Sequence, residues 1–216
     1  MIDSEFQAPS SESEHFPWPP RENDSVLDAL GRTWKDSVFH PTSFFARMPR
    51  ENDFGWVLAY YLLIGVVTAG ISLFWEMVFG PSLLERLLWR DEVQPGNPFM
   101  DFLLSPLWLL IGLFLIAGVI HVCLLLVRGA RHSFGTTLRV ICFSGGPQLF
   151  GVVPFAGPAV GGIWTLVITV IGLREAHETT TGRALAGLLI PLGFFVILLV
   201  LVMMAAFVMG LGGVQI

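Results

Sequence analysis

Hydrophobic and polar positions divide the chain at about residue 54, beyond which long apolar runs are separated by short polar segments. A helix that crosses the hydrocarbon core of a bilayer needs about 20 consecutive apolar residues. The runs therefore predict an all-α polytopic membrane protein whose fold is a bundle of five transmembrane helices. The predicted spans cover about 54–79, 102–127, 134–153, 159–173 and 184–209.

The third and fourth spans come from one run, 140–173, which contains no Asp, Glu, Lys or Arg over thirty-four residues. As a single helix this run would be about 51 Å long, too long for one crossing and slightly short for two. Beginning at Ser133 supplies the missing length, with Arg139 snorkelling back to the headgroups. The run is broken near its middle by Pro154, Gly157 and Pro158. We therefore predict two spans joined by a tight apolar hairpin.

Arginines near the spans favour one orientation, because cytoplasmic loops carry an excess of basic residues. With the N-terminus in the cytoplasm and the C-terminus outside, seven arginines fall on the inner side, namely Arg47, Arg50, Arg128, Arg131, Arg139, Arg174 and Arg183. Only Arg86 and Arg90 fall on the outer side. In a four-span alternative, 140–173 forms a re-entrant loop. Five arginines then fall on the inner side and four on the outer side, so the count shows no bias. The count favours five spans in a cytoplasmic (inner) membrane.

Residues 1–53 form an acidic tail before the membrane domain of 54–210, with ten of the seventeen acidic residues and five of the twelve basic ones. The tail contains no apolar core of the kind that a secretory signal needs, so we expect it to be retained in the cytoplasm. We expect 1–23 to be disordered, because a segment so rich in Ser, Glu and Pro buries too little apolar surface to order itself.

Two short amphipathic helices are predicted to lie flat at the lipid interface. The first begins at Asp24 or Ser25 and is ended by His40-Pro41. It would lead the chain into the membrane, although the same face could dock a partner helix. The second covers about 82–90, where a capping box precedes four leucines on one face.

The high hydrophobic and low charged content of the chain indicates which partners it can have. The chain is 54% hydrophobic and only 13% charged, so it has little surface for water and membrane lipids are its expected surroundings. No nucleic-acid partner, cofactor or metal is indicated. Cys123 and Cys142 lie in apolar segments and are interpreted as packing residues.

Polar residues inside the apolar runs are the candidates for function, because each is costly in lipid and tends to face the bundle interior. His121, Arg139 and Gln148 could line a path through the membrane. His121 is more simply a structural residue, bonded to a backbone carbonyl or to Gln148. Gly157 and Gly161 begin a row of small residues that permits close helix packing, within the bundle or in a homo-oligomer.

A polar corner precedes the last span. Glu175, His177 and Glu178, with or without His132, offer oxygen and nitrogen ligands for a divalent cation. Against this, His177 and Glu178 are adjacent and would point apart on a helix. The simpler interpretation is a capped cytoplasmic corner in which Arg174 meets lipid phosphate.

Three segments resemble the membrane domain of the Yip (Ypt/Rab-interacting protein) family in its prokaryotic form. They are Ser133-Phe-Gly-Thr-Thr-Leu-Arg-Val, Gly-Val-Val-Pro154-Phe-Ala-Gly157, and Ile163-Trp164 running to Ile171-Gly-Leu-Arg-Glu-Ala-His177. The resemblance covers roughly residues 30–200. It implies a five-helix bundle with a cytoplasmic N-terminus, and its eukaryotic relatives bind prenylated small GTPases. The acidic tail shows no GTPase-binding motif.

Two functions from different classes follow. The first is a non-enzymatic membrane protein that organises or recruits lipids, other membrane proteins or a second copy of itself. The alternative is a small transporter or lipid-permeation protein whose path passes His121, Arg139 and Gln148.

Overall fold

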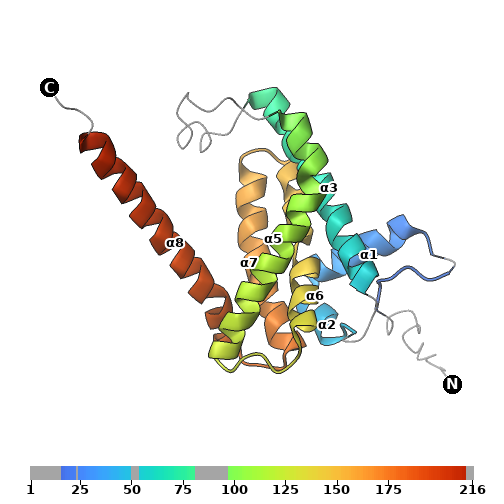
Figure 1. Ribbon diagram of the computed structural model, residues 1–216. Helices are drawn as coiled ribbons and strands as arrows, with labels where there is room; N and C mark the ends of the chain where they lie inside the picture. Colours follow the sequence, from blue (N-terminus) through green and yellow to red (C-terminus); the bar gives the residue numbers. More distant parts are fainter. Residues whose placement is uncertain (1–15, 23, 50–53, 81–96, 213–216) are drawn as a thin grey trace, which may run out of the picture.

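The computed structural model describes residues 16–22, 24–49, 54–80 and 97–212. The rest of the tail and the predicted flat helix at 82–90 lie outside the described residues. The elements are α1 (Val26–Phe39), α2 (Pro41–Ala46), α3 (Phe54–Phe79), α5 (Pro98–Leu126), α6 (Phe134–Ser144), the 3-10 helix η2 (Gly146–Val152), α7 (Ala156–Ala176) and α8 (Thr181–Gly212). Figure 1 shows a bundle of α3, α5, α6 and α7, with α1 and α2 against one side and α8 extending away from it.

Four helices of the described chain are long and apolar enough to cross a membrane: α3, α5, α7 and α8. The prediction of an all-α polytopic membrane protein is therefore confirmed. The predicted number of five membrane-spanning helices is wrong. The span expected at 134–153 is divided into the eleven-residue α6 and the seven-residue η2.

The break has a local cause in the sequence. Gly145 and Gly146 have low helix propensity. Pro147 has no backbone N–H to continue the α-helical hydrogen bonds. The chain therefore leaves α6 and tightens into the 3-10 form, in which each residue rises about 2.0 Å. Together α6 and η2 extend about 30 Å. That distance equals the thickness of the hydrocarbon core, so the broken segment is long enough to cross it.

Contacts with α3 show that the broken segment runs the length of that helix. At one end, a Cβ added to Gly135 would lie 2.6 Å from the ring of Phe54, the first residue of α3. At the other end, the indole N–H of Trp75 donates to the carbonyl oxygen of Gly151 at 3.0 Å. Phe54 and Trp75 are about 31 Å apart along α3. The chain therefore runs along the bundle four times, in the continuous helices α3, α5 and α7 and in one broken segment, before α8 extends away from it.

Backbone carbonyls released by the break are taken up by tryptophans. Non-helical backbone at membrane depth is stable only where protein groups satisfy it. The carbonyl of Gly146 accepts from the indole N–H of Trp34 at 2.9 Å, and that of Gly151 accepts from Trp75. α6 itself is enclosed by its neighbours, and eight of its eleven residues are buried. Burial explains how a crossing segment can contain Thr, Ser and Arg.

The N-terminal segment is held against the bundle rather than being free throughout. Trp18 is 1% exposed, and its indole N–H donates to the carbonyl oxygen of Trp56 at 2.6 Å. Phe16 packs against Phe44 and Phe143 with ring centroids 4.8 and 5.7 Å apart. The expectation of disorder up to residue 23 is therefore wrong for 16–22. These aromatic rings bury enough surface to hold a segment whose other residues favour disorder.

α1 packs on the bundle through small and polar side chains. Its buried residues are Ala29, Thr33, Ser37 and Val38. The indole N–H of Trp164 in α7 donates to the carbonyl oxygen of Val38 at 3.0 Å, which fixes the end of α1. Leu27 and Phe39 remain 76% and 56% exposed. The apolar stripe expected to lie on lipid is therefore divided, with one part on the bundle and one part outward.

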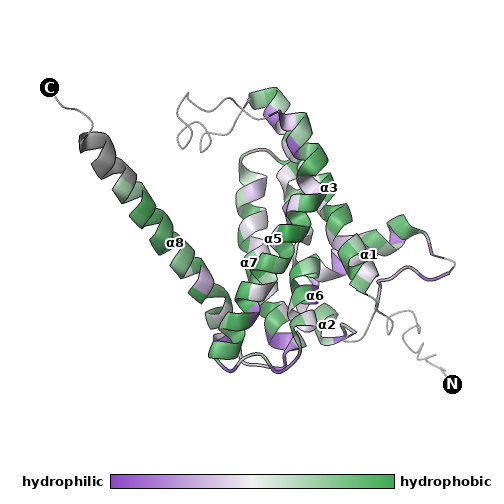
Figure 2. Ribbon diagram, viewed as in Figure 1, coloured by the Kyte–Doolittle hydropathy of each residue, from purple (hydrophilic) through white to green (hydrophobic). Residues whose placement is uncertain are grey.

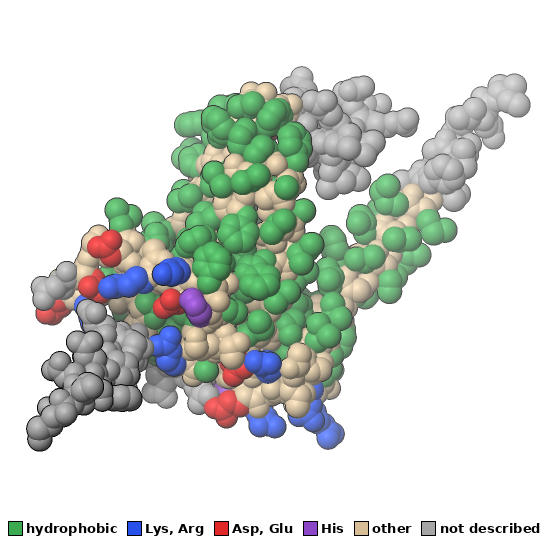
Figure 3. Space-filling model, turned by 180° about the vertical axis from the view of Figure 1, so that it is seen from behind, with side chains coloured by type: hydrophobic (Ala, Val, Ile, Leu, Met, Phe, Trp, Pro, Cys, Tyr) green, Lys and Arg blue, Asp and Glu red, His purple; other side chains and the backbone are tan. Residues whose placement is uncertain are grey.

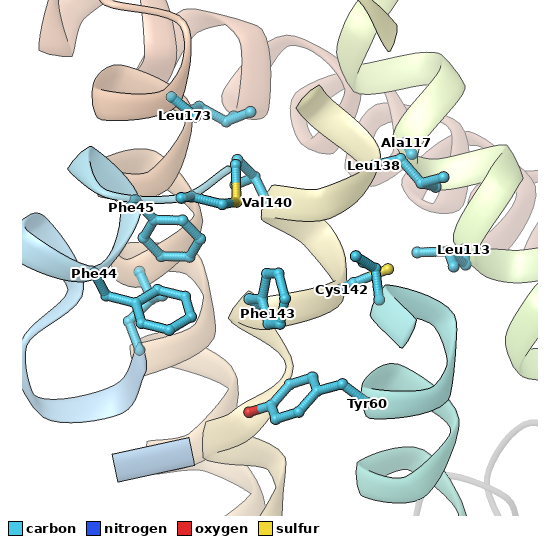
Figure 4. Close-up of a cluster of buried hydrophobic side chains, with 14 of the residues drawn as sticks. Phe44, Phe45, Tyr60, Leu113, Ala117, Leu138, Val140, Cys142, Phe143 and Leu173 are labelled. Atoms are coloured by element: carbon cyan, nitrogen blue, oxygen red, sulfur yellow. The ribbon is translucent and has the colours of Figure 1, made fainter. Parts of the chain in front are cut away.

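The buried core surrounds α6 at the end of the bundle where α2 packs. In Figure 4, the rings of Phe44, Phe45, Tyr60 and Phe143 lie close together, and Phe143 comes from α6. Tyr60 and Phe143 have ring centroids 5.1 Å apart, and Phe44 and Phe143 have centroids 5.4 Å apart. α2 and the start of α3 are thereby joined to the centre of the bundle.

α8 differs from the other long helices in its burial. In its most apolar window only 6% of the residues are buried, against 22%, 28% and 33% in α3, α5 and α7. Its contacts lie near its start, where Ala184 and Leu188 are buried and Gly187 lies under the side chain of Leu124. Figure 2 shows the apolar shaft of α8 standing apart from the bundle.

Candidate functional site

A chain of hydrogen-bonded polar side chains joins three elements at the end of the bundle where α8 begins. Nε2 of His177, the residue that ends α7, lies 2.9 Å from the hydroxyl oxygen of Thr137 in α6. The same oxygen lies 2.8 Å from Nδ1 of His121 in α5. His177 and Thr137 are both fully buried. We call these three residues the histidine relay.

The direction of the relay follows from one donor that cannot reverse. The backbone N–H of His132 points to Nδ1 of His177 at 3.2 Å, and a backbone N–H can only donate. Neutral His177 therefore has its proton on Nε2 and donates to Thr137. The Thr137 hydroxyl, having accepted one hydrogen bond, donates its own hydrogen to Nδ1 of His121. In the neutral form both ring nitrogens of His177 and Nδ1 of His121 are thus paired.

The relay corrects the partner expected for His121. The sequence suggested a backbone carbonyl or Gln148, but the partner is Thr137. Phe134 closes the other side of the His121 ring, edge-on at 5.7 Å between centroids. Sequence reasoning missed Thr137 because a threonine in an apolar helix is unremarkable. Its one signal was the pair Thr136-Thr137 next to the charge-free run.

The polar corner around His177 is assembled mainly by local pairs. Arg174 donates from Nε to Oε1 of Glu175 at 2.9 Å. Nε2 of His132 lies 3.9 Å from Oε1 of Glu178, too far for a hydrogen bond. Within the described residues, no three His, Cys, Asp or Glu side chains are grouped as a metal ion would require. The hydrogen bond from the backbone N–H of His132 to His177 ties the end of α7 to the loop before α6.

Arg139 is buried beside the first residue of α3. Its residue is 2% exposed, and its guanidinium carbon lies 4.5 Å from the centroid of the Phe54 ring. A guanidinium on an aromatic face is attracted by the ring quadrupole, more strongly where water is excluded. The contact joins α6 to the start of α3.

Gln148 lies apart from the other two residues of the predicted path. It is exposed on η2 and lines a groove between α3 and α5. His121 faces Thr137 and Arg139 faces Phe54, so the three residues have three separate surroundings. Of the three, only Gln148 lines one of the grooves described for this molecule.

The glycine row of α7 packs inside the chain. A Cβ added to Gly157 would lie 1.9 Å from the carbonyl oxygen of Phe150, and one added to Gly161 would lie 2.5 Å from that of Pro147. Both glycines therefore allow α7 to approach η2. Pro154 and Phe155 form the turn between the two elements, where Phe155 has a φ of 63°. Of the two uses predicted for the row, the structure places these two glycines in packing within the bundle.

The fold and these contacts define a polytopic helical membrane protein in which an N-terminal segment is packed onto a bundle with one broken crossing. The Yip1 domain model matches residues 35–204. The chain therefore belongs to the Yip1 domain family. The matched region includes the relay, the broken segment and most of α8. No curated protein and no solved structure matches the chain.

Proposed function

We propose that this Yip1-domain protein is a non-enzymatic organiser of other membrane components, and that α8 is the helix that receives them. The observation that carries the proposal is the exposure of α8. From Leu189 to Ala205 the helix continues for about 24 Å, and over this length its residues are exposed or half-exposed. Helices in lipid associate through close packing, so a partner helix would gain contacts here that the chain itself does not provide.

The packed N-terminal segment supports a second role at the membrane surface. The indole N–H groups of Trp18 and Trp34 donate to backbone carbonyls of the bundle, and that of Trp164 donates to the carbonyl oxygen of Val38 in α1, so these three bonds fix the segment. Leu27 and Phe39 then face outward from a helix that cannot turn freely. A rigid amphipathic helix beside a bundle is suited to holding lipid headgroups or a peripheral partner in a defined place.

The orientation that we propose places the N-terminus in the cytoplasm and the C-terminus outside, in the inner membrane. Four passes along the bundle, followed by α8, put α1 and the end of α8 at opposite ends. Figure 3 shows basic side chains gathered at the lower end of the bundle and beside the N-terminal segment. Arg128, Arg131 and Arg183 all lie in or beside the loops at the end where α8 begins. Basic loops remain preferentially in the cytoplasm.

Transport is the less supported function. Its predicted path required His121, Arg139 and Gln148 to share one route, whereas each contacts different residues. His121 is engaged by Thr137, and Arg139 is buried over Phe54. Neither arrangement leaves a polar surface in common with Gln148.

Site-specific photo-crosslinking in native membranes tests the organiser proposal. A photoreactive amino acid at Phe194 of the full-length chain, 69% exposed on α8, should give a discrete protein adduct. The matched control is Leu115, 66% exposed on α5, where lipid adducts are expected. A second copy of this chain or another membrane protein crosslinked from Phe194 supports the proposal. Lipid adducts alone at both positions would overturn it.

A further inference from the structure

A groove with a volume of about 440 Å³ lies between α3 and α5 and reaches η2. It is separate from the histidine relay and from the exposed face of α8. On the α5 side it follows Asp101, Ser105, Leu109, Gly112 and Ile116, which share one face of the helix at intervals of three or four residues. The groove therefore runs along the helices, with its length parallel to the direction in which a lipid chain lies.

The polar residues of the groove gather towards the start of α5. Gly70 faces Phe102 and Gly65 faces Leu109, which sets Thr68 and Ser72 of α3 level with the first turns of α5. Gln148 lies about 6 Å along η2 from Gly151, the residue bonded to Trp75, and so falls near the same level. Asp101 and Ser105 lie on the facing helix. The polar end thus combines carboxylate, hydroxyl and amide groups from three elements.

Towards its other end the groove is lined by Tyr61, Leu109 and Ile116. Gly112 leaves room there, because a Cβ at this position would meet nothing within 4 Å. From Asp101 to Ile116 the helix rises about 22 Å. Half of a bilayer, including one headgroup layer, is about 20–22 Å thick. The length and the polarity gradient both match a single leaflet lipid with its headgroup at Asp101.

Charge selects the headgroup. Asp101 contributes a carboxylate, and among the described residues that line the groove none is Lys or Arg. The hydroxyl of Ser105 is buried without a hydrogen-bond partner, and the Gln148 amide offers both donors and an acceptor. We propose that this groove binds one glycerophospholipid with an ammonium headgroup, taken from the leaflet at which α5 begins. The ammonium pairs with Asp101, the polar oxygens of the lipid bond Ser105 and Gln148, and an acyl chain lies over Gly112.

Native mass spectrometry of the full-length protein tests the assignment. The protein is exchanged from detergent into nanodiscs of equal phosphatidylethanolamine, phosphatidylglycerol and phosphatidylcholine, and then released with its retained lipid. We expect phosphatidylethanolamine to be retained about fivefold over phosphatidylglycerol, the effect of one ion pair near the membrane surface. Asp101→Asn should reduce that ratio to about one, since it removes the charge and keeps the shape.

Two glycine variants separate the groove from general lipid contact. A Cβ at Gly112 or at Gly118 meets nothing within 4 Å, so leucine fits at both positions of α5. Gly112 lines the groove and Gly118 does not. Gly112→Leu should abolish retention and Gly118→Leu should leave it unchanged. Equal loss in both variants, equal retention of the phosphatidylethanolamine and phosphatidylglycerol lipids by the unsubstituted protein, or detergent as the only retained molecule would overturn the proposal.

Discussion

His177 and Thr137 meet through a buried hydrogen bond of 2.9 Å that joins the end of α7 to α6. Because the same hydroxyl also bonds His121, one threonine connects three elements of the bundle. Buried polar groups are costly when they lose a partner, and this cost is what makes the relay a fixed point of the fold. We expect its contribution to be structural.

Thr137→Val should destabilise the protein, because valine keeps the shape of the side chain but leaves two histidine nitrogens without a partner. The expected loss is about 1–3 kcal/mol of unfolding free energy. Reversible unfolding in bicelles measures it. Thr169→Val is the matched control, since the Thr169 hydroxyl bonds only the carbonyl of Thr165 within its own helix. An equal, small loss of unfolding free energy in both variants would show that the histidine relay does not stabilise the fold.

Gly161→Ala and Gly162→Ala should have opposite effects although the residues are neighbours. At Gly161 the added carbon would lie 2.5 Å from a backbone oxygen of η2, whereas at Gly162 it meets nothing within 4 Å. We expect about 1–3 kcal/mol of destabilisation at Gly161. At Gly162 we expect up to about 1 kcal/mol of stabilisation from helix propensity. Thermal unfolding midpoints in detergent decide the comparison, and destabilisation at Gly162 would contradict it.

Local sequence patterns predicted the helices whose ends or apolar lengths are visible in neighbouring residues. Ser25 and His40-Pro41 bracket α1, and the apolar run from Phe54 to Phe79 is α3. The ends of α1 and the length of α3 depend on residues that are neighbours in the chain, so both could be predicted from the sequence. The break at Gly145 was missed because hydropathy records how apolar a segment is and not which helix it forms.

Contacts between residues far apart in the chain also could not be predicted from the sequence. The contact of Trp18 with Trp56 joins residues 38 positions apart, and that of Trp34 with Gly146 joins residues 112 apart. Nothing in the composition of an acidic, Pro-rich tail indicates that one indole in it is buried. Among the candidate residues, the sequence found His121 and His177 but not Thr137 between them.

Tryptophan N–H groups should contribute to the stability of the broken crossing. Trp75→Phe keeps an aromatic ring and leaves the carbonyl oxygen of Gly151 without its 3.0 Å donor. We expect a loss of about 1–3 kcal/mol, read from the unfolding midpoint. Trp108→Phe serves for comparison, because Trp108 is 62% exposed on α5. If Trp108→Phe costs as much as Trp75→Phe, the indole bond to η2 contributes nothing specific.

Trp18→Ala should release the N-terminal segment while the bundle stays folded. Truncating a buried aromatic side chain costs about 3–5 kcal/mol, and here the cost falls on one packed segment. Hydrogen–deuterium exchange should rise across α1 and α2 and stay unchanged in α5. Leu27→Ala, at a position 76% exposed, should change neither. Protection of α1 that persists in Trp18→Ala would show that this indole does not hold the segment.

We propose that the chain crosses the membrane five times although one crossing is not a continuous helix. Cysteines introduced one at a time at Arg131, Phe155 and Gly182, in a chain whose Cys123 and Cys142 are replaced by alanine, test it directly with a membrane-impermeant maleimide on sealed vesicles. Phe155 is 79% exposed at the turn after η2, and a Cβ at Gly182 meets nothing within 4 Å. Five crossings predict that Arg131→Cys and Gly182→Cys are labelled from one side and Phe155→Cys from the other. Labelling of all three from the same side would contradict the account.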